Sequence, residues 1–223
     1  ASTNFAANPY PFVQDGCFRY YFGLDRPDLI GLTDTATGDA WMFGEEAGID
    51  GTIWFGAEPT LGELAARAGV DRTGSRTDLA ERLAEALRLG RPIRFPPPYR
   101  SETALTLAAL LDRPHAAVVQ ADDADLIAAI VVQREVKAPE EIAEMEAALR
   151  ITRAMHHAAM AHTGPGVVEQ AMVGLMEGIA RGAGLRFAYQ PIFSGRGEIL
   201  HNLRYDRTLA DGELVVNDAG VTS

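Results

Sequence analysis

Two helical segments separated by Gly164-Pro165-Gly166 constrain the fold of this chain more than any other sequence feature. The first follows a charged break at residues 134–137 and has Pro139 in its first turn, where the missing N–H of proline costs nothing. The second runs from about Val167 to Arg181 and ends at glycines. Strand-like segments follow both helices, at residues 187–193, 199–202 and 213–217. Helices followed by strands in this order predict an α+β arrangement.

The first of these helices carries an apolar stripe that we expect to be buried. The stripe consists of Ile142, Met145, Leu149, Thr152 and Met155 with His156.

The first half of the chain alternates short apolar segments with turns. Residues 18–24, 29–33 and 40–43 are predicted to be strands of a small meander. Residues 60–68 and 77–89 are predicted to be helices, and Thr60 with Glu63 forms a capping pattern. Three further segments follow: a predicted helix at 101–110, a predicted strand at 116–120, and residues 125–133, for which periodicity does not separate helix from strand.

Composition excludes several functional classes. The 223 residues are 47% hydrophobic and 23% charged, which is typical of a globular protein in water, and we expect no membrane span. The formal net charge of -11 argues against a nucleic-acid partner, because phosphates demand a basic surface. Residues 1–8 show no signal-peptide pattern, and the single cysteine, Cys17, allows neither an internal disulfide nor a thiolate zinc site. We therefore expect a cytoplasmic protein.

Two residues are candidates for chemistry on pattern alone. His201 lies in a short apolar segment between glycine-rich and charged turns, where an imidazole can face a cleft or can be an ordinary core-edge histidine. Asp218 ends the apolar run 214–217, where it can hold an ion or can form a turn. The other histidines do not converge, since neighbours on a helix, such as His156 and His157, point about 100° apart. The glycines in 194–197 lack the lysine and hydroxyl of a P-loop, so a tight turn is expected there.

Several stretches together resemble the aminopeptidase P (Xaa-Pro aminopeptidase) branch of the pita-bread metallopeptidases. They are Tyr10 to Asp15 with Phe18 to Leu24, Ile53 to Gly56, Lys137 to Ile142, Pro191 to Gly195, Ile199 to Asn202 and Leu209 to Gly220. Their order and spacing are similar to that family from about Asn8 to Gly220. The resemblance implies an aminopeptidase P-like, creatinase/prolidase-like N-terminal domain at 1–134, with a mixed sheet and flanking helices. It also implies that 135–223 is the first part of a pita-bread catalytic domain.

The resemblance also implies an activity and two site residues. His201 matches the family's substrate-side histidine, which stabilises the tetrahedral intermediate and moves protons, and Asp218 matches the first metal-binding aspartate. In this family two divalent ions, most often manganese and sometimes cobalt or zinc, share a bridging water and activate it. The implied reaction removes an N-terminal residue that precedes proline, and the implied assembly is a homo-oligomer, either a dimer or a tetramer.

The match leaves the metal site incomplete. The family uses a second aspartate, a histidine and two glutamates further on, whereas this sequence ends at Ser223. One carboxylate cannot hold two hard cations, so we expect the chain by itself to bind metal weakly and to be inactive. Three alternatives stay open: a prolidase, which takes only dipeptides; a creatinase, which shares the fold without metal; and a non-catalytic binding module that kept the fold and lost the ligands.

Overall fold

A computed structural model describes residues 3–5 and 8–222 of the chain. The chain divides into two compact units, one ending at Ala129 and one beginning at Ile130. This division falls within helix α7 (Ala124–Glu135), near the domain boundary predicted between residues 134 and 135. Residues 125–133, for which periodicity did not separate helix from strand, are thus helical.

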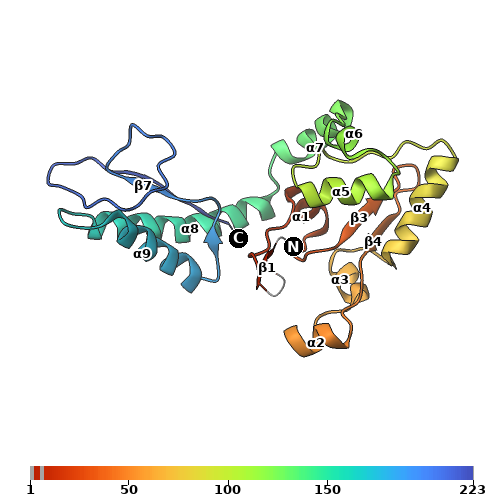
Figure 1. Ribbon diagram of the computed structural model, residues 1–223, viewed down its shortest axis with the longest axis horizontal. Helices are drawn as coiled ribbons and strands as arrows, with labels where there is room; N and C mark the ends of the chain where they lie inside the picture. The colour runs from red at the N-terminus through yellow and green to blue at the C-terminus, as the bar shows by residue number, and fades with distance from the viewer. Residues whose placement is uncertain (1–2, 6–7, 223) are drawn as a thin grey trace. The chain divides into compact units, whose positions relative to one another are not determined.

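The first unit is built on a three-stranded mixed sheet (Figure 1). Strand β3 (Ile30–Thr33) pairs antiparallel with β4 (Ala40–Phe43), and β4 pairs parallel with β5 (Arg72–Gly74). The strands predicted at 29–33 and 40–43 and the mixed sheet are thus confirmed. The predicted meander is wrong, because the third strand comes from residues after helix α3 (Leu61–Arg67) and runs parallel to β4.

Strand β4 separates two apolar clusters because its successive side chains point to opposite faces. Trp41 and Phe43 pack with Leu79 and Leu83 of helix α4 (Arg76–Arg88). Met42 points the other way, into a cluster that includes α3 residues. The second cluster consists of Leu24, Met42, Leu61, Leu64, Ala65 and Val70. The sheet therefore has an apolar layer on each face.

The aromatic segment at 18–24 is a helix and not the predicted strand. Helix α1 (Gly16–Phe22) begins where the Asp15 side chain accepts hydrogen bonds from the backbone N–H groups of Cys17 and Phe18. It ends at Gly23, whose φ of 64° is the left-handed conformation that favours glycine. Phe18 and Phe22, one helical turn apart, stack with ring centroids 4.8 Å apart. These caps and this contact outweigh the strand preference of the aromatic residues.

The other helices of the first unit follow their capping signals. Thr60 and Glu63 form the predicted capping box of α3, and Ser75 with Asp78 forms a second one on α4. Helix α5 (Ser101–Leu110) has the predicted bounds. Residues 116–120 were predicted as a strand, but they belong mostly to α6 (His115–Val119), which begins directly after Pro114. The remaining elements are α2 (Ile49–Phe55) and the pair β1 (Thr3–Phe5) and β2 (Asn8–Pro9).

The second unit packs two helices against short antiparallel strand pairs. Helices α8 (Pro139–His162) and α9 (Glu169–Gly182) lie side by side, joined through the turn at residues 164–166 (Figure 1). Strand β6 (Arg186–Phe187) pairs with β9 (Val221–Thr222), and β7 (Ile192–Ser194) pairs with β8 (Val216–Asp218). The core of this unit consists of Met155, Ala159, Met172, Val173, Met176, Ala180, Phe193, Leu209 and Ala219. The predicted order of two helices followed by strands is confirmed.

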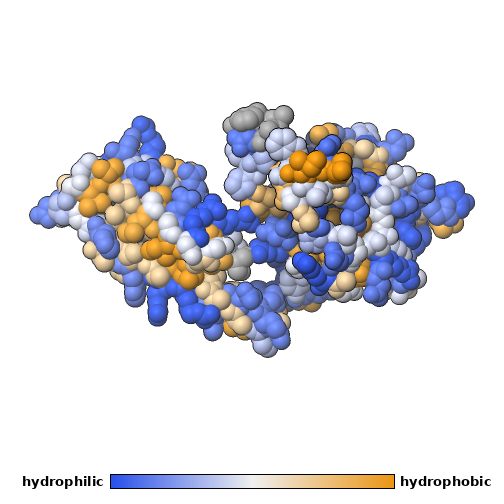
Figure 2. All heavy atoms as spheres, turned by 90° about the horizontal axis from the view of Figure 1, so that it is seen from below, coloured by the Kyte–Doolittle hydropathy of each residue, from blue (hydrophilic) through white to orange (hydrophobic). Residues whose placement is uncertain are grey.

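Two predictions about the second unit are wrong. The N-terminal half of α8 is not covered: Ile142, Met145 and Leu149 are 46%, 53% and 59% exposed, because the core of the unit contacts only the C-terminal half of the helix. Residues 199–202 form a turn instead of a strand, with Asn202 donating its backbone N–H to the carbonyl of Ile199. Apolar side chains also lie elsewhere on the surface of the molecule, as the orange areas of Figure 2 show.

None of the helices within residues 3–5 and 8–222 is long and apolar enough to cross a membrane.

Candidate functional site

Asp218 is the last residue of β8, at the strand end where the sequence placed it. It pairs with Ile192 of β7, and its neighbour Asn217 pairs with the buried Phe193. Since side chains alternate along a strand, the contact of Asn217 with α8 places Asp218 on the opposite face. Asp218 is exposed there, so its carboxylate projects from the face of the β7–β8 pair that α8 leaves uncovered.

Among residues 3–5 and 8–222, the Asp218 carboxylate has one hydrogen-bond partner, Tyr189. The Tyr189 hydroxyl donates a hydrogen bond to Oδ1 of Asp218 over 2.5 Å. This hydrogen bond, with partial burial, raises the pKa of Tyr189 above its usual value, because losing the proton would place two negative charges together. Tyr189 therefore stays a hydrogen-bond donor and orients the carboxylate.

His156 contacts the residues on both sides of Asp218, the backbone of Ala219 and the side chain of Asn217. Its Nε2 lies 2.9 Å from the carbonyl oxygen of Ala219, and its Nδ1 lies 3.2 Å from Nδ2 of Asn217. A neutral imidazole protonated on Nε2 satisfies both contacts, donating to the carbonyl and accepting from the amide. The half-buried His156 is a core-edge histidine, as expected. Its contact with the strand that carries Asp218 was not foreseen, because the partners lie 61 and 63 residues away.

His201 lies on the long loop between β7 and β8, in the turn at residues 197–201. Its side chain is exposed, as is that of Leu200. The structure thus places His201 and Asp218 in the same unit, both on the surface, and describes no hydrogen bond between them in residues 8–222. Neither residue lines the surface hollow along α8 at Leu149 or the one at the Gly164–Pro165 turn.

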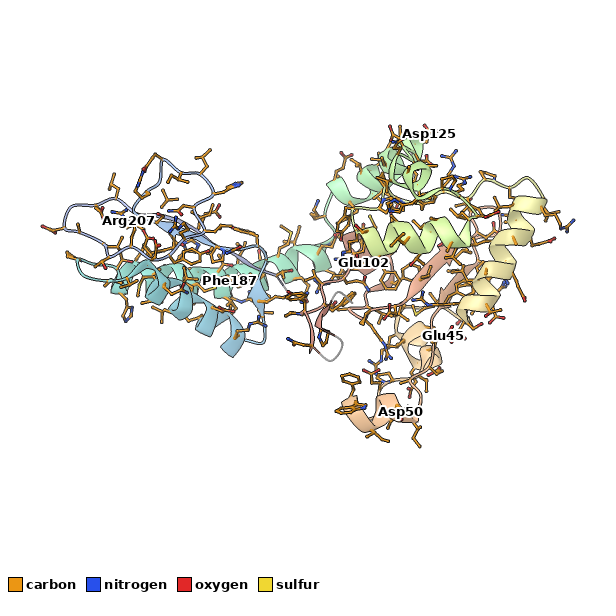
Figure 3. All side chains as sticks on the ribbon, in the orientation of Figure 1. Glu45, Asp50, Glu102, Asp125, Phe187 and Arg207 are labelled. Atoms are coloured by element: carbon orange, nitrogen blue, oxygen red, sulfur yellow. The ribbon has the colours of Figure 1, made fainter. Side chains whose placement is uncertain are left out.

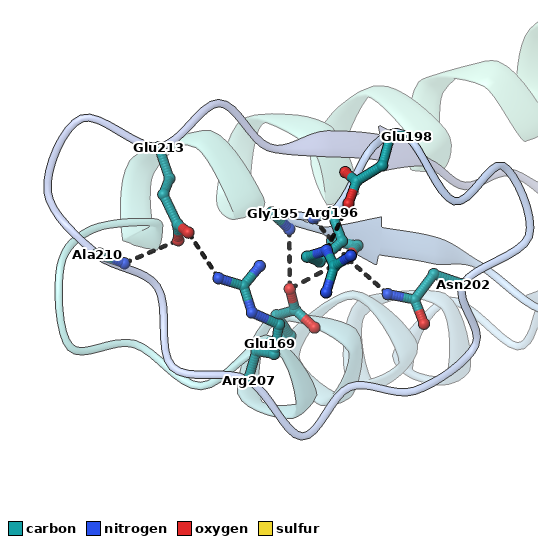
Figure 4. A network of polar contacts seen from close by, with 9 residues as sticks. Glu169, Gly195, Arg196, Glu198, Asn202, Arg207, Ala210 and Glu213 are labelled. Atoms are coloured by element: carbon teal, nitrogen blue, oxygen red, sulfur yellow. Dashed lines mark hydrogen bonds and ion pairs between the residues drawn. The ribbon is translucent and has the colours of Figure 1, made fainter.

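A buried polar network anchors the loop that carries His201 (Figure 4). Glu169, the first residue of α9, is fully buried and accepts hydrogen bonds from the Gly195 N–H (2.8 Å) and the Ser194 hydroxyl (3.2 Å). Ser194 in turn accepts a hydrogen bond from Nδ2 of Asn202 (2.9 Å). The tight turn predicted at 194–197 is therefore tied to α9 and to the residue after His201.

Arg207 anchors the far side of the same loop, and Figure 3 labels it there. Its Nη2 donates to Oε1 of Glu213 over 2.6 Å. This hydrogen bond, reinforced by the charges of Glu213, Glu169 and Glu198, raises the pKa of Arg207. Hydrogen bonds from the Ala210 N–H and from Arg207 lower the pKa of Glu213. Both groups are therefore charged near neutral pH, and the ion pair closes the loop between residues 207 and 213.

The described residues do not by themselves fit a metal centre. No group of three or more histidine, cysteine, aspartate or glutamate side chains that could hold an ion occurs among residues 8–222. Asp218 offers a single carboxylate, whereas Mn²⁺, Co²⁺ and Zn²⁺ need four to six ligands. Any metal chemistry at Asp218 thus requires ligands beyond those that the structure describes.

Sequence comparison finds two families along the chain. Residues 2–93 match the aminopeptidase P N-terminal domain, and residues 143–223 match metallopeptidase family M24. The Xaa-Pro aminopeptidase of Escherichia coli (strain K12) is 27% identical over 98% of this chain and 52% of its own length.

Solved structures of similar proteins share this fold. Proline aminopeptidase P II from Yersinia pestis superimposes with a TM-score of 0.81 at 26% identity, covering 99% of this chain and 53% of that one. Zinc-substituted E. coli aminopeptidase P in complex with product gives a TM-score of 0.79 at 25% identity, covering 98% and 52%. The chain thus spans about half the length of these relatives.

Proposed function

Since this chain has an aminopeptidase P N-terminal domain followed by part of a metallopeptidase family M24 domain, we propose that the whole protein is a metal-dependent aminopeptidase. Its substrates are peptides with proline at the second position, and it releases the residue before that proline. The E. coli relative is named for this specificity, and it is the enzyme whose zinc-substituted form binds product.

The observation that carries the proposal is the position of Asp218. Its carboxylate lies at the end of β8, on the face away from α8, and Tyr189 and His156 hold it and its strand in place. An exposed carboxylate whose orientation is already fixed by its neighbours is suited to binding a cation, because the side chain loses little conformational freedom when the ion binds. Asp218 is therefore proposed as one ligand of a two-ion centre, with manganese as the metal that the family resemblance implies and cobalt or zinc as alternatives.

His201 is proposed to act on the substrate. An imidazole N–H can donate a hydrogen bond to the oxygen that becomes negative when the scissile carbonyl is attacked, and a ring that has taken up the proton released by the attacking water can pass it to the leaving amine. The exposure of His201 on its loop leaves the ring accessible to a peptide. The anchors at Ser194 and Arg207 limit where the ring can lie.

Peptide hydrolysis by the whole protein tests the proposal. A tripeptide with proline at position two is expected to lose its first residue, and a matched tripeptide with alanine at position two is expected to be cut at least about tenfold more slowly. A chelator is expected to remove the activity, and added Mn²⁺ to restore it. Cleavage of Xaa-Pro dipeptides alone indicates a prolidase, and activity that survives chelation contradicts the metal mechanism.

A further inference from the structure

Glu169 is a buried carboxylate that the proposed chemistry does not use. It is fully buried at the first position of α9. One of its oxygens, Oε1, accepts two hydrogen bonds, while Oε2 is buried with no hydrogen-bond partner among the residues that the structure describes. Burying a carboxylate with an unpaired oxygen costs free energy, so a role beyond packing is a reasonable expectation for this group.

The hydrogen bonds of Glu169 lead to His201 through two residues. The Ser194 hydroxyl donates its proton to Oε1 of Glu169, which leaves its oxygen free to accept from Nδ2 of Asn202 and from the Arg196 N–H (3.0 Å). A serine hydroxyl has one donor and two acceptor positions, so Ser194 is completely satisfied by these contacts. Asn202 follows His201 directly in the sequence. The orientation of Glu169 therefore constrains the backbone next to the imidazole.

Arg207 restrains the other side of the loop and lies against Gly195, whose N–H the Glu169 carboxylate holds. The negative charge of Glu169 contributes to raising the pKa of Arg207, after the hydrogen bond to Glu213. The Nη1 of Arg207 is buried without a hydrogen-bond partner among the described residues, and it would lie 2.9 Å from a Cβ placed on Gly195. Arg207 thus packs against the backbone that Glu169 holds, and His201 lies between these two anchors in the sequence.

We propose that Glu169 is a positioning residue for His201, acting through Ser194, Asn202 and Arg207 to fix the loop that carries the imidazole. This inference rests on the proposed role of His201 in peptide hydrolysis. Glu169 does not touch the substrate; it decides how often the ring occupies the reactive position. Misplacing a reacting group by about 1 Å can cost roughly 100-fold in rate, so the loss of this anchor has a measurable effect on turnover.

The test compares Glu169→Ala with Glu177→Ala in the whole protein, because Glu177 is an exposed glutamate on the same helix. For Glu169→Ala, kcat on a Xaa-Pro-Xaa peptide is expected to fall about 10- to 100-fold, with KM and bound metal within about twofold of the original protein. Hydrogen exchange of the backbone amides in residues 195–204 is expected to become faster. Glu177→Ala is expected to leave kcat and exchange unchanged.

Asn202→Ala is the second variant, since it removes the tether and leaves the buried carboxylate in place. It is expected to lower kcat, as Glu169→Ala is, and to speed hydrogen exchange of the backbone amides in residues 199–204. If Glu169→Ala does not fold, these two measurements on Asn202→Ala test the inference. Unchanged exchange in both variants, or a fall in kcat that only follows metal loss, overturns the inference. If the original protein hydrolyses no Xaa-Pro peptide, the proposed function fails, while the exchange measurement still reports whether Glu169 anchors the loop.

Discussion

Replacing Asp218 with alanine in the whole protein is expected to reduce peptidase activity by at least about 1,000-fold, which corresponds to about 4 kcal/mol of lost transition-state stabilisation. The carboxylate is held by Tyr189 and lies on the uncovered face of β8, and alanine offers no oxygen to a cation there. Metal content, measured by elemental analysis after dialysis, is expected to fall in the same variant.

Asp211→Ala is the matched control, because Asp211 is another exposed aspartate on the same long segment. It is expected to keep both activity and metal within about twofold, as surface substitutions usually do. Retention of full activity by Asp218→Ala would remove Asp218 from the metal centre.

The second large effect is expected from His201→Ala. The kcat of this variant is expected to fall about 100-fold or more, the usual contribution of a proton-transferring or oxyanion-stabilising group. Bound metal is expected to stay unchanged, because His201 is assigned to the substrate and not to the ions. Stability is also expected to stay unchanged, since the side chain is exposed.

His157→Ala serves as the comparison, because His157 is an exposed histidine on α8. Steady-state kinetics and elemental analysis on both variants distinguish a histidine that acts on the substrate from one that binds metal. Normal kcat in His201→Ala, or a loss of metal equal to its loss of activity, contradicts the assigned role.

Much of the fold was predictable because its signals are local. The capping boxes at Thr60 and Ser75 and the proline at the start of α8 involve residues within one helical turn, so the sequence alone indicates them. Segment 18–24 was mispredicted because its aromatic composition favours a strand. Most of it instead belongs to helix α1, whose two ends are capped by Asp15 and Gly23. The apolar stripe of α8 was also predicted too broadly, since only tertiary contacts show which half of a helix is covered.

The candidate site was predictable only at the level of single residues. Asp218 was placed at a strand end from its apolar run, and this position is confirmed, while its role as a ligand stays a prediction. The contact of His156 with the strand that carries Asp218 could not be assigned from sequence, because its partners lie 61 and 63 residues away. The burial of Glu169 could not be assigned either, because a glutamate in the first turn of a helix normally faces water. Glu169 is buried only because residues 194–207 fold over it, and that contact joins segments 25 and 26 residues apart.

The most direct measurement is a crystal structure of the whole protein grown with Mn²⁺, using the anomalous signal of the ions to locate them. Two peaks are expected, about 3.5–4 Å apart as in other two-metal sites. At least one of them is expected within about 2.2 Å of an Asp218 oxygen, the usual distance for such a bond. Ions bound elsewhere, with the Asp218 carboxylate contacting only Tyr189 and solvent, would contradict the proposed metal centre.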